Sequence, residues 1–160
     1  MSAETFDDGM LTVGFLLMPA FSMMAFVSAV EPLRVANRLG ERSLFGWEIV
    51  TPDGKPAQAS NDMSLVAAHA VADAPTYKLA IVCAGFEPGR HATPAIDRWL
   101  RRHDRAGAPL GAMDTGAFLL AGAHLLDGHR ATVHWESLES FREQFPAVET
   151  EGGLFVIDGN

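Results

Sequence analysis

The sequence predicts an α/β domain in which helices cover both faces of a mostly parallel sheet. Continuous apolar runs with β-branched residues recur along the chain, and such runs are typical of strands buried on both faces. Segments with helical periodicity and capping residues lie between these runs. Strands that alternate with helices indicate a parallel sheet with crossover connections.

We expect strands at residues 10–17, 47–50, 64–66, 78–83, 109–113 and 154–157. Ser22 opens the first helix, which has a wide apolar stripe, and Thr93 followed by Pro94 opens the second, because these residue types favour helix starts. A third helix is expected over residues 115–126, and a charged, amphipathic segment follows at residues 136–145.

Composition limits the classes of function. The 160 residues suit one domain, and the formal net charge of −8 makes direct binding of nucleic acid by this segment unfavourable. Cys83 is the one cysteine, which excludes an intrachain disulfide and fits the cytoplasm. Residues 1–9 are polar and are expected to form a flexible terminus, not a signal peptide. The apolar stretch 11–30 is interrupted by Pro19 and two serines, so we predict no membrane span.

The junction of the strand at 109–113 with the following helix is the best candidate for a site. A sharp strand-to-helix turn lifts its residue, here Asp114, above the sheet, where amides at the helix start face the same space. Gly85 follows another strand, and the crevice beyond strand carboxyl ends is where α/β sheets bind ligands. Two alternatives stay open: Asp114 only caps the helix, and Gly85 only turns the chain.

Three motifs occur in order: EPLRVAN at residues 31–37, DTGAF at 114–118 and LLDGHRATVHWE at 125–136. Together they resemble the N-terminal domain of GlxA-type transcriptional regulators of the AraC/XylS class. That domain belongs to the flavodoxin-like ThiJ/PfpI, or class I glutamine amidotransferase-like, superfamily. The resemblance covers residues 12–159. It implies an effector-sensing domain of a cytoplasmic bacterial regulator that forms a homodimer. DNA binding would require a C-terminal helix-turn-helix domain that this sequence lacks, so we expect an incomplete C-terminus.

The resemblance also assigns site residues. Enzymatic relatives have a nucleophilic Cys at the turn, a His after it and a Glu from the first helix, and these positions fall on Asp114, His134 and Glu31. The loop whose amides hold an oxyanion falls on Ala84 and Gly85. Because a carboxylate replaces the thiolate, thiol chemistry should be absent, and we expect no catalytic residue and no cofactor.

If Glu31, Asp114 and His134 converge, the two carboxylates repel each other unless they share a proton or a cation. The predicted ligand is therefore a small cationic or zwitterionic nitrogen metabolite. Similar regulators with Asp at the turn act in choline, carnitine, betaine or amino-acid catabolism. Trp135 would add a cation–π face. The predicted ligand-binding residues are Glu31, Gly85, Asp114, Thr115, His134 and Trp135.

Other readings remain open at this point. The chain would be a hydrolase or amidase if Asp114 acts as nucleophile or base with His134, or a purely structural dimerisation module. Glu31 would be an exposed acid, and Trp135 a core residue. The remaining histidines lack metal-ligand spacing, so we predict no metal site.

Overall fold

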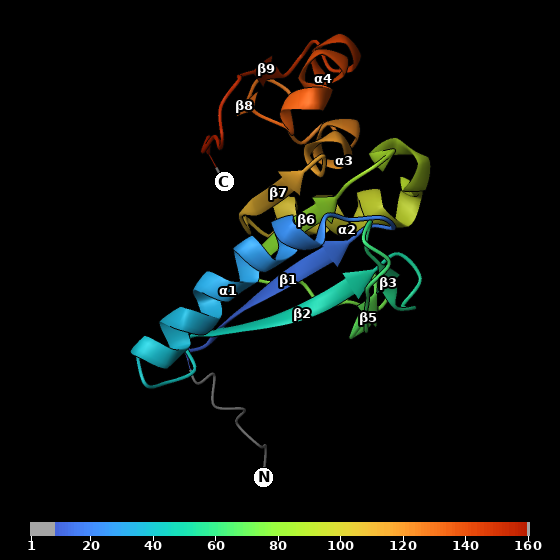
Figure 1. Cartoon of the computed structure of the whole chain (residues 1–160). Helices are drawn as coiled ribbons and strands as arrows, with labels where there is room; N and C mark the ends of the chain where they lie inside the picture. Colours follow the sequence, from blue (N-terminus) through green and yellow to red (C-terminus); the bar gives the residue numbers. More distant parts are fainter. Residues whose placement is uncertain (1–8, 160) are drawn as a thin grey trace.

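The computed structural model describes residues 9–159, in which helices alternate with strands except between residues 45 and 84, where five strands follow one another (Figure 1). The strands are β1 (Leu11–Leu17), β2 (Phe45–Thr51), β3 (Ala57–Gln58), β4 (Ser64–Leu65), β5 (His69–Ala70), β6 (Leu79–Ala84), β7 (Leu110–Asp114), β8 (Arg130–Ala131) and β9 (Glu149–Thr150). The helices are α1 (Met23–Leu39), α2 (Pro94–Arg105), α3 (Ala117–Gly122) and α4 (Leu138–Gln144), with short 3-10 helices η1 (Pro88–His91) and η2 (Trp135–Ser137). The flexible terminus predicted for residues 1–9 lies outside the described residues, apart from Gly9.

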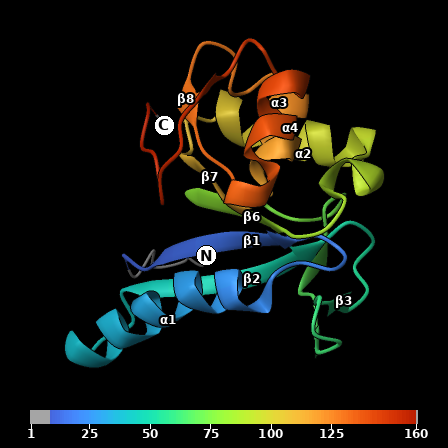
Figure 2. The ribbon, with the colours of Figure 1, turned by 45° about the horizontal axis from the view of Figure 1, so that its top comes forward.

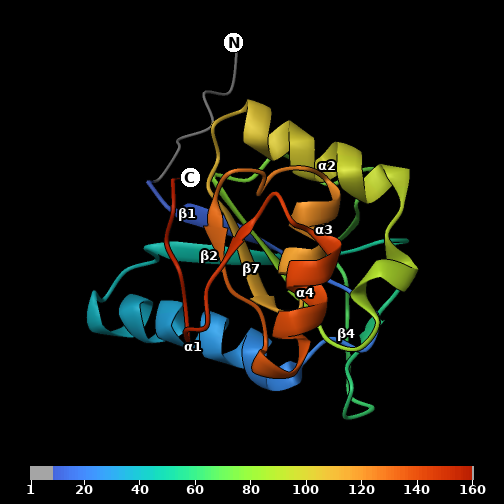
Figure 3. The same ribbon diagram turned by 90° about the horizontal axis from the view of Figure 1, so that it is seen from above.

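A five-stranded parallel sheet, in the order β5-β2-β1-β6-β7, organises the domain and confirms the predicted fold class. Helix α1 covers one face, and α2 lies on the other with α3 and α4 (Figures 2 and 3). In register, Leu17 of β1 pairs with Cys83 of β6, and Ala84 of β6 pairs with Asp114 of β7. The carboxyl ends of these three strands therefore meet at one edge of the sheet.

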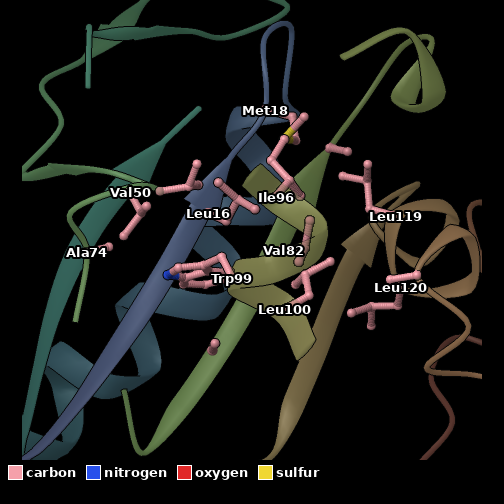
Figure 4. Packing of buried hydrophobic residues seen from close by; sticks show 14 of the residues in the cluster. Leu16, Met18, Val50, Ala74, Val82, Ile96, Trp99, Leu100, Leu119 and Leu120 are labelled. Carbon is pink, nitrogen blue, oxygen red and sulfur yellow. The ribbon is translucent and has the colours of Figure 1, made fainter. Parts of the chain in front are cut away.

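The alternation of side chains along β1 divides the core between the two faces. Phe15 points toward α1, where its ring meets that of Phe26 edge-on at 5.3 Å between centroids. Leu16 points the other way and belongs to the cluster that contains Trp99 and Leu100 of α2 (Figure 4). A strand covered on both faces must be apolar at consecutive positions, which explains the unbroken apolar run.

A buried polar cluster joins the sheet to α2, and the sequence patterns did not reveal it. His103 is fully buried, and its Nδ1–H donates to the Trp99 carbonyl at 2.8 Å while Nε2 accepts from the Tyr77 amide at 3.0 Å. The Tyr77 hydroxyl donates to Glu48 at 2.7 Å. Burial lowers the pKa of His103. The pKa of Tyr77 is raised, mainly by burial and to a smaller extent by the Glu48 carboxylate. Gly14 leaves room for the tyrosine, since a Cβ there would lie 2.2 Å from the ring.

The prediction of a strand at residues 154–157 is wrong. Those residues form no strand, and the Leu154 side chain is completely exposed. Side chains hold this segment instead: Thr132 donates to the Gly153 carbonyl, and Arg130 donates to the Ile157 carbonyl. Apolar composition is insufficient for a strand without a ladder of backbone partners.

The third helix is shorter than the predicted range of residues 115–126. Helix α3 begins after a turn in which the Gly116 amide donates to the Met113 carbonyl, and it ends before His124, whose φ of 57° is incompatible with a right-handed helix. Among residues 9–159, no helix has both the length and the apolar character needed to cross a bilayer.

Candidate functional site

Asp114 occupies a strained turn at the carboxyl end of β7. Its φ is 60°, in the left-handed region that non-glycine residues seldom adopt. The turn is tight because Gly116 packs against the sheet, where a Cβ would lie 2.4 Å from the Val82 carbonyl oxygen. This geometry matches the strand-to-helix turn predicted from the sequence. The N-cap of α3 is Gly116, which has no side chain, and among residues 9–159 no amide at the helix start donates to the Asp114 carboxylate, as the capping alternative would require.

Gly85 and Thr115 connect the ends of β6 and β7. The Thr115 hydroxyl donates to the Gly85 carbonyl at 2.5 Å. Gly85 also approaches the backbone before α1 closely, since a Cβ there would lie 2.2 Å from the Ala20 carbonyl oxygen. The close approach of Gly85 is thus toward the chain itself. Gly85 nevertheless lines a cavity.

A cavity of about 380 Å³ lies beyond the carboxyl ends of β1, β6 and β7, and we call it the acidic cavity. It is lined by Ser22, Ser60, Gly85, Phe86, Glu87, Pro88, Asp114, Thr115, His134, Glu136 and Ser137. Four of the six predicted ligand-binding residues are in this set. They are Gly85, Asp114, Thr115 and His134.

Three residues at or beside the acidic cavity have left-handed backbone conformations although none of them is glycine. Their φ values are 58° at Ala20, 50° at Glu87 and 60° at Asp114. Strain of this kind costs about 1–3 kcal/mol for each residue and is concentrated at functional sites. Its occurrence in three separate segments around one cavity supports a functional role for the cavity.

The ionisable groups of the cavity make it acidic. Burial raises the pKa of Asp114, His134 opposes this effect, and the Glu136 carboxylate adds to it. Glu136 also lies 3.9 Å from Nδ1 of His134. The predicted site residues did not include Glu136. Its position in the third motif, two residues after His134, was the available signal.

Cys83 lies near the carboxyl end of β6, close to Asp114, and its side chain is fully buried. Burial, with the Asp114 charge as a second cause, raises the pKa of this thiol to about 12. A thiolate is the reactive form of cysteine, so Cys83 does not replace the missing nucleophile.

Glu31 does not join Asp114 and His134 in the cavity. Its carboxylate lies 2.7 Å from the Arg34 guanidinium, and its side chain is 47% exposed, as the exposed-acid alternative expected. Ser22 at the start of α1 lines the cavity, whereas Glu31 is nine residues later, about 13 Å along the helix axis. A crossover helix runs away from the carboxyl ends of the strands, so only its first turn reaches the site. A ligand-binding role for Glu31 stays a prediction.

Another residue of the first motif has a structural function. The Asn37 amide accepts from the backbone N–H groups of Leu44 and Phe45 and donates to the Phe45 carbonyl. This residue therefore fixes the connection from α1 to β2.

Trp135 is 74% exposed, so the alternative that placed it in the core is wrong. Its ring centroid lies 5.7 Å from that of His134, with 35° between the planes, and it does not line the acidic cavity. A ligand contact at Trp135 stays a prediction. Within residues 9–159, no three His, Cys, Asp or Glu side chains are placed to hold a metal ion together.

Comparison with known proteins agrees with this architecture. Residues 13–160 match the DJ-1/PfpI family. The HTH-type transcriptional regulator CdhR of Pseudomonas aeruginosa is 51% identical over 145 residues, which cover 91% of this chain and 43% of that protein. GlxA of Rhizobium meliloti, also an HTH-type transcriptional regulator, is 37% identical over 160 residues, which cover 99% of this chain and 49% of that protein.

Among solved structures, an AraC family transcriptional regulator from Pseudomonas putida superposes with a TM-score of 0.81 at 30% identity. The match covers 92% of this chain and 80% of that chain. This chain spans less than half the length of the curated relatives CdhR and GlxA. From the sequence match and the sheet topology together, the chain belongs to the DJ-1/PfpI family.

Proposed function

We propose that this chain is the effector-sensing domain of a bacterial transcriptional regulator, and that its acidic cavity binds a small cationic or zwitterionic nitrogen compound. The observation that carries the proposal is the placement of Asp114 at a strained turn, half-buried, in a cavity shared with Glu136. The regulatory role is supported by relatives that are HTH-type transcriptional regulators. Homodimer formation, and DNA binding through a further domain, belong to this proposal.

A bound cation would offset the electrostatic cost of placing these carboxylates in one cavity. Burial and Glu136 both disfavour the charged form of Asp114, and His134 offsets only part of this effect. A positive group between the two carboxylates favours ionised Asp114, so binding should strengthen as pH rises through the raised pKa of this residue. The hydroxyls of Ser60 and Ser137 line the same space and can donate to the carboxylate or hydroxyl of a zwitterion.

The test is titration calorimetry with choline, betaine, carnitine and arginine. Asp114→Asn and Glu136→Gln each remove one negative charge while keeping the shape of the side chain, and we expect at least tenfold weaker binding in each. Asp62→Asn is the control for the first variant, because Asp62 also has a positive φ, of 67°, but lies in an exposed turn. Glu139→Gln is the control for the second, since Glu139 is exposed and paired with Arg142.

Equal binding by wild type and both cavity variants would contradict the proposal, and so would the absence of binding for all four compounds. Ester or amide hydrolysis by the wild type that is lost in Asp114→Asn would instead favour the enzymatic alternative, in which Asp114 acts with His134.

A further inference from the structure

A second cavity, of about 580 Å³, adjoins the acidic cavity. We call it the aromatic cavity because the half-buried rings of Phe118 and Phe145 form part of its wall, packed edge-on at 5.8 Å between centroids. It lies between η1, α3 and α4. The two cavities share Glu87, Pro88 and Ser137 as lining residues, so one boundary separates them.

This boundary is neutral. The carboxylate of Glu87 lies 3.1 Å from the Arg90 guanidinium, which also lines the aromatic cavity. Ser137 contributes an uncharged hydroxyl. The carboxylates of the acidic cavity other than Glu87 are therefore Asp114 and Glu136, while the space beyond Ser137 offers aromatic surface.

Two glycines that line the aromatic cavity have free space beside them. A Cβ built on Gly89 of η1 or on Gly122 of α3 would meet no atom within 4 Å. Both residues line the cavity, so larger side chains there would enter free space. Small-molecule sites commonly have volumes of about 300–1,000 Å³, and the acidic cavity alone is near the lower limit.

We infer that the two cavities form one ligand site that takes a cation carrying an aliphatic chain. The amine or quaternary ammonium head lies between Asp114 and Glu136, and the chain passes Ser137 and lies on the rings of Phe118 and Phe145. The ligand class is thus an alkylated or acylated amine, larger than a bare ammonium metabolite. This inference rests on the function proposed above for the acidic cavity.

The experiment measures binding of alkyltrimethylammonium ions with methyl, butyl, hexyl and octyl chains, below their micelle concentrations. If the chain enters the aromatic cavity, affinity should rise about two- to fourfold for each added methylene, as expected for burial of apolar surface. Binding that does not depend on chain length would overturn the inference and leave the proposed function intact. Absence of binding throughout the series would overturn both.

Filling variants distinguish this cavity from other apolar surface. Gly122 on α3 and Ser140 on α4 both line the aromatic cavity. Gly122→Trp and Ser140→Trp add bulk there and should abolish the dependence on chain length while keeping the affinity for tetramethylammonium. Gly122→Ala and Ser140→Ala are the matched controls and should keep the dependence. A chain-length dependence that persists in both tryptophan variants would show that the chain binds elsewhere, which contradicts the inference.

Discussion

The backbone N–H of His134 donates a hydrogen bond of 3.2 Å to the carbonyl oxygen of Asp114. This contact joins two site residues from different segments through main-chain atoms alone. Substitution of either side chain therefore leaves the connection between the turn and the η2 segment in place. Variants at Asp114 and His134 report on the chemistry of the side chains more directly than on the fold.

We predict that Asp114→Asn stabilises the domain at neutral pH. The native state raises the pKa of this carboxyl, so the folded protein favours the protonated form and loses stability as pH rises through that pKa. Asparagine has no charge to bury and is also common in the left-handed region. Because the carboxyl is only half-buried, solvent screening limits the gain, which we expect to stay below about 1 kcal/mol, or about 2–4 °C in melting temperature for a domain of this size.

The increase should be complete at pH 7–8 and should shrink as the pH falls toward 3, where wild-type Asp114 is protonated. Thermal melts of Asp114→Asn and of the control Asp62→Asn across this range test the prediction. A melting temperature for Asp114→Asn that stays at or below the wild-type value at pH 8 would contradict it.

Cys83 should resist thiol reagents in the native protein. The side chain is fully buried, and the raised pKa of about 12 leaves almost no thiolate at neutral pH. With an aromatic disulfide reagent at pH 8 we expect negligible reaction over minutes in buffer and one reacted thiol in guanidinium chloride. Rapid stoichiometric labelling without denaturant would show that this strand end opens.

His103→Ala should destabilise the domain by about 3 kcal/mol. The change leaves the buried Tyr77 N–H and Trp99 carbonyl without the imidazole partner, and each unsatisfied group costs about 1–3 kcal/mol. His124→Ala is the control, because the His124 side chain is 70% exposed, and we expect a cost of at most about 1 kcal/mol, since alanine tolerates the positive φ at this position less well than histidine. Urea unfolding gives both values.

The cost of His103→Ala should also depend on pH. Because burial lowers the pKa of His103 below its ordinary value of 6.5, its contribution is complete above pH 6.5 and is lost as pH falls toward the native pKa. The variant should therefore be closer to wild type at pH 5 than at pH 8. An equal difference at both values would mean that the ring does not titrate differently on folding.

Two glycines of the same region should respond in opposite ways to alanine. Gly116→Ala places a methyl group 2.4 Å from the Val82 carbonyl oxygen, and we expect a loss of about 3 kcal/mol or more because backbone atoms must move. Gly122→Ala meets no neighbouring atom and improves helix propensity, which should add up to about 1 kcal/mol. Thermal melts that place Gly116→Ala level with Gly122→Ala would contradict the tight packing of the turn.

Local patterns predicted most of the fold. Ser22 and Thr93 cap α1 and α2 through their hydroxyls, at 3.3 Å from the Ala25 and Ile96 amides, because a cap requires only residues three positions apart. The turn at Asp114 was equally local. The apolar run at residues 154–157 has the composition of a strand. Whether it pairs depends on segments far away in the sequence, and local composition carries no information about them.

The site was harder to predict because it depends on tertiary distances. Motif order placed Glu31 and Asp114 in one family pattern, but the axial rise of α1 carries Glu31 about 13 Å beyond Ser22. Glu136 reaches the cavity because the backbone hydrogen bond from His134 to Asp114 holds the segment after β8 beside the turn. Likewise, Tyr77 and His103 are 26 residues apart and meet only when α2 packs on the sheet.

The left-handed residues Ala20, Glu87 and Asp114 give the acidic cavity a further property. Their conformations are set when the domain folds, so a ligand meets walls that are already ordered and loses little affinity to ordering them. In the proposed sensor, a bound ligand must still change the structure of the domain. The Trp135–Ser137 segment is the wall that packing constrains least, because its first two side chains are largely exposed. We therefore expect a ligand to shift this short helix and to leave the strand ends unchanged.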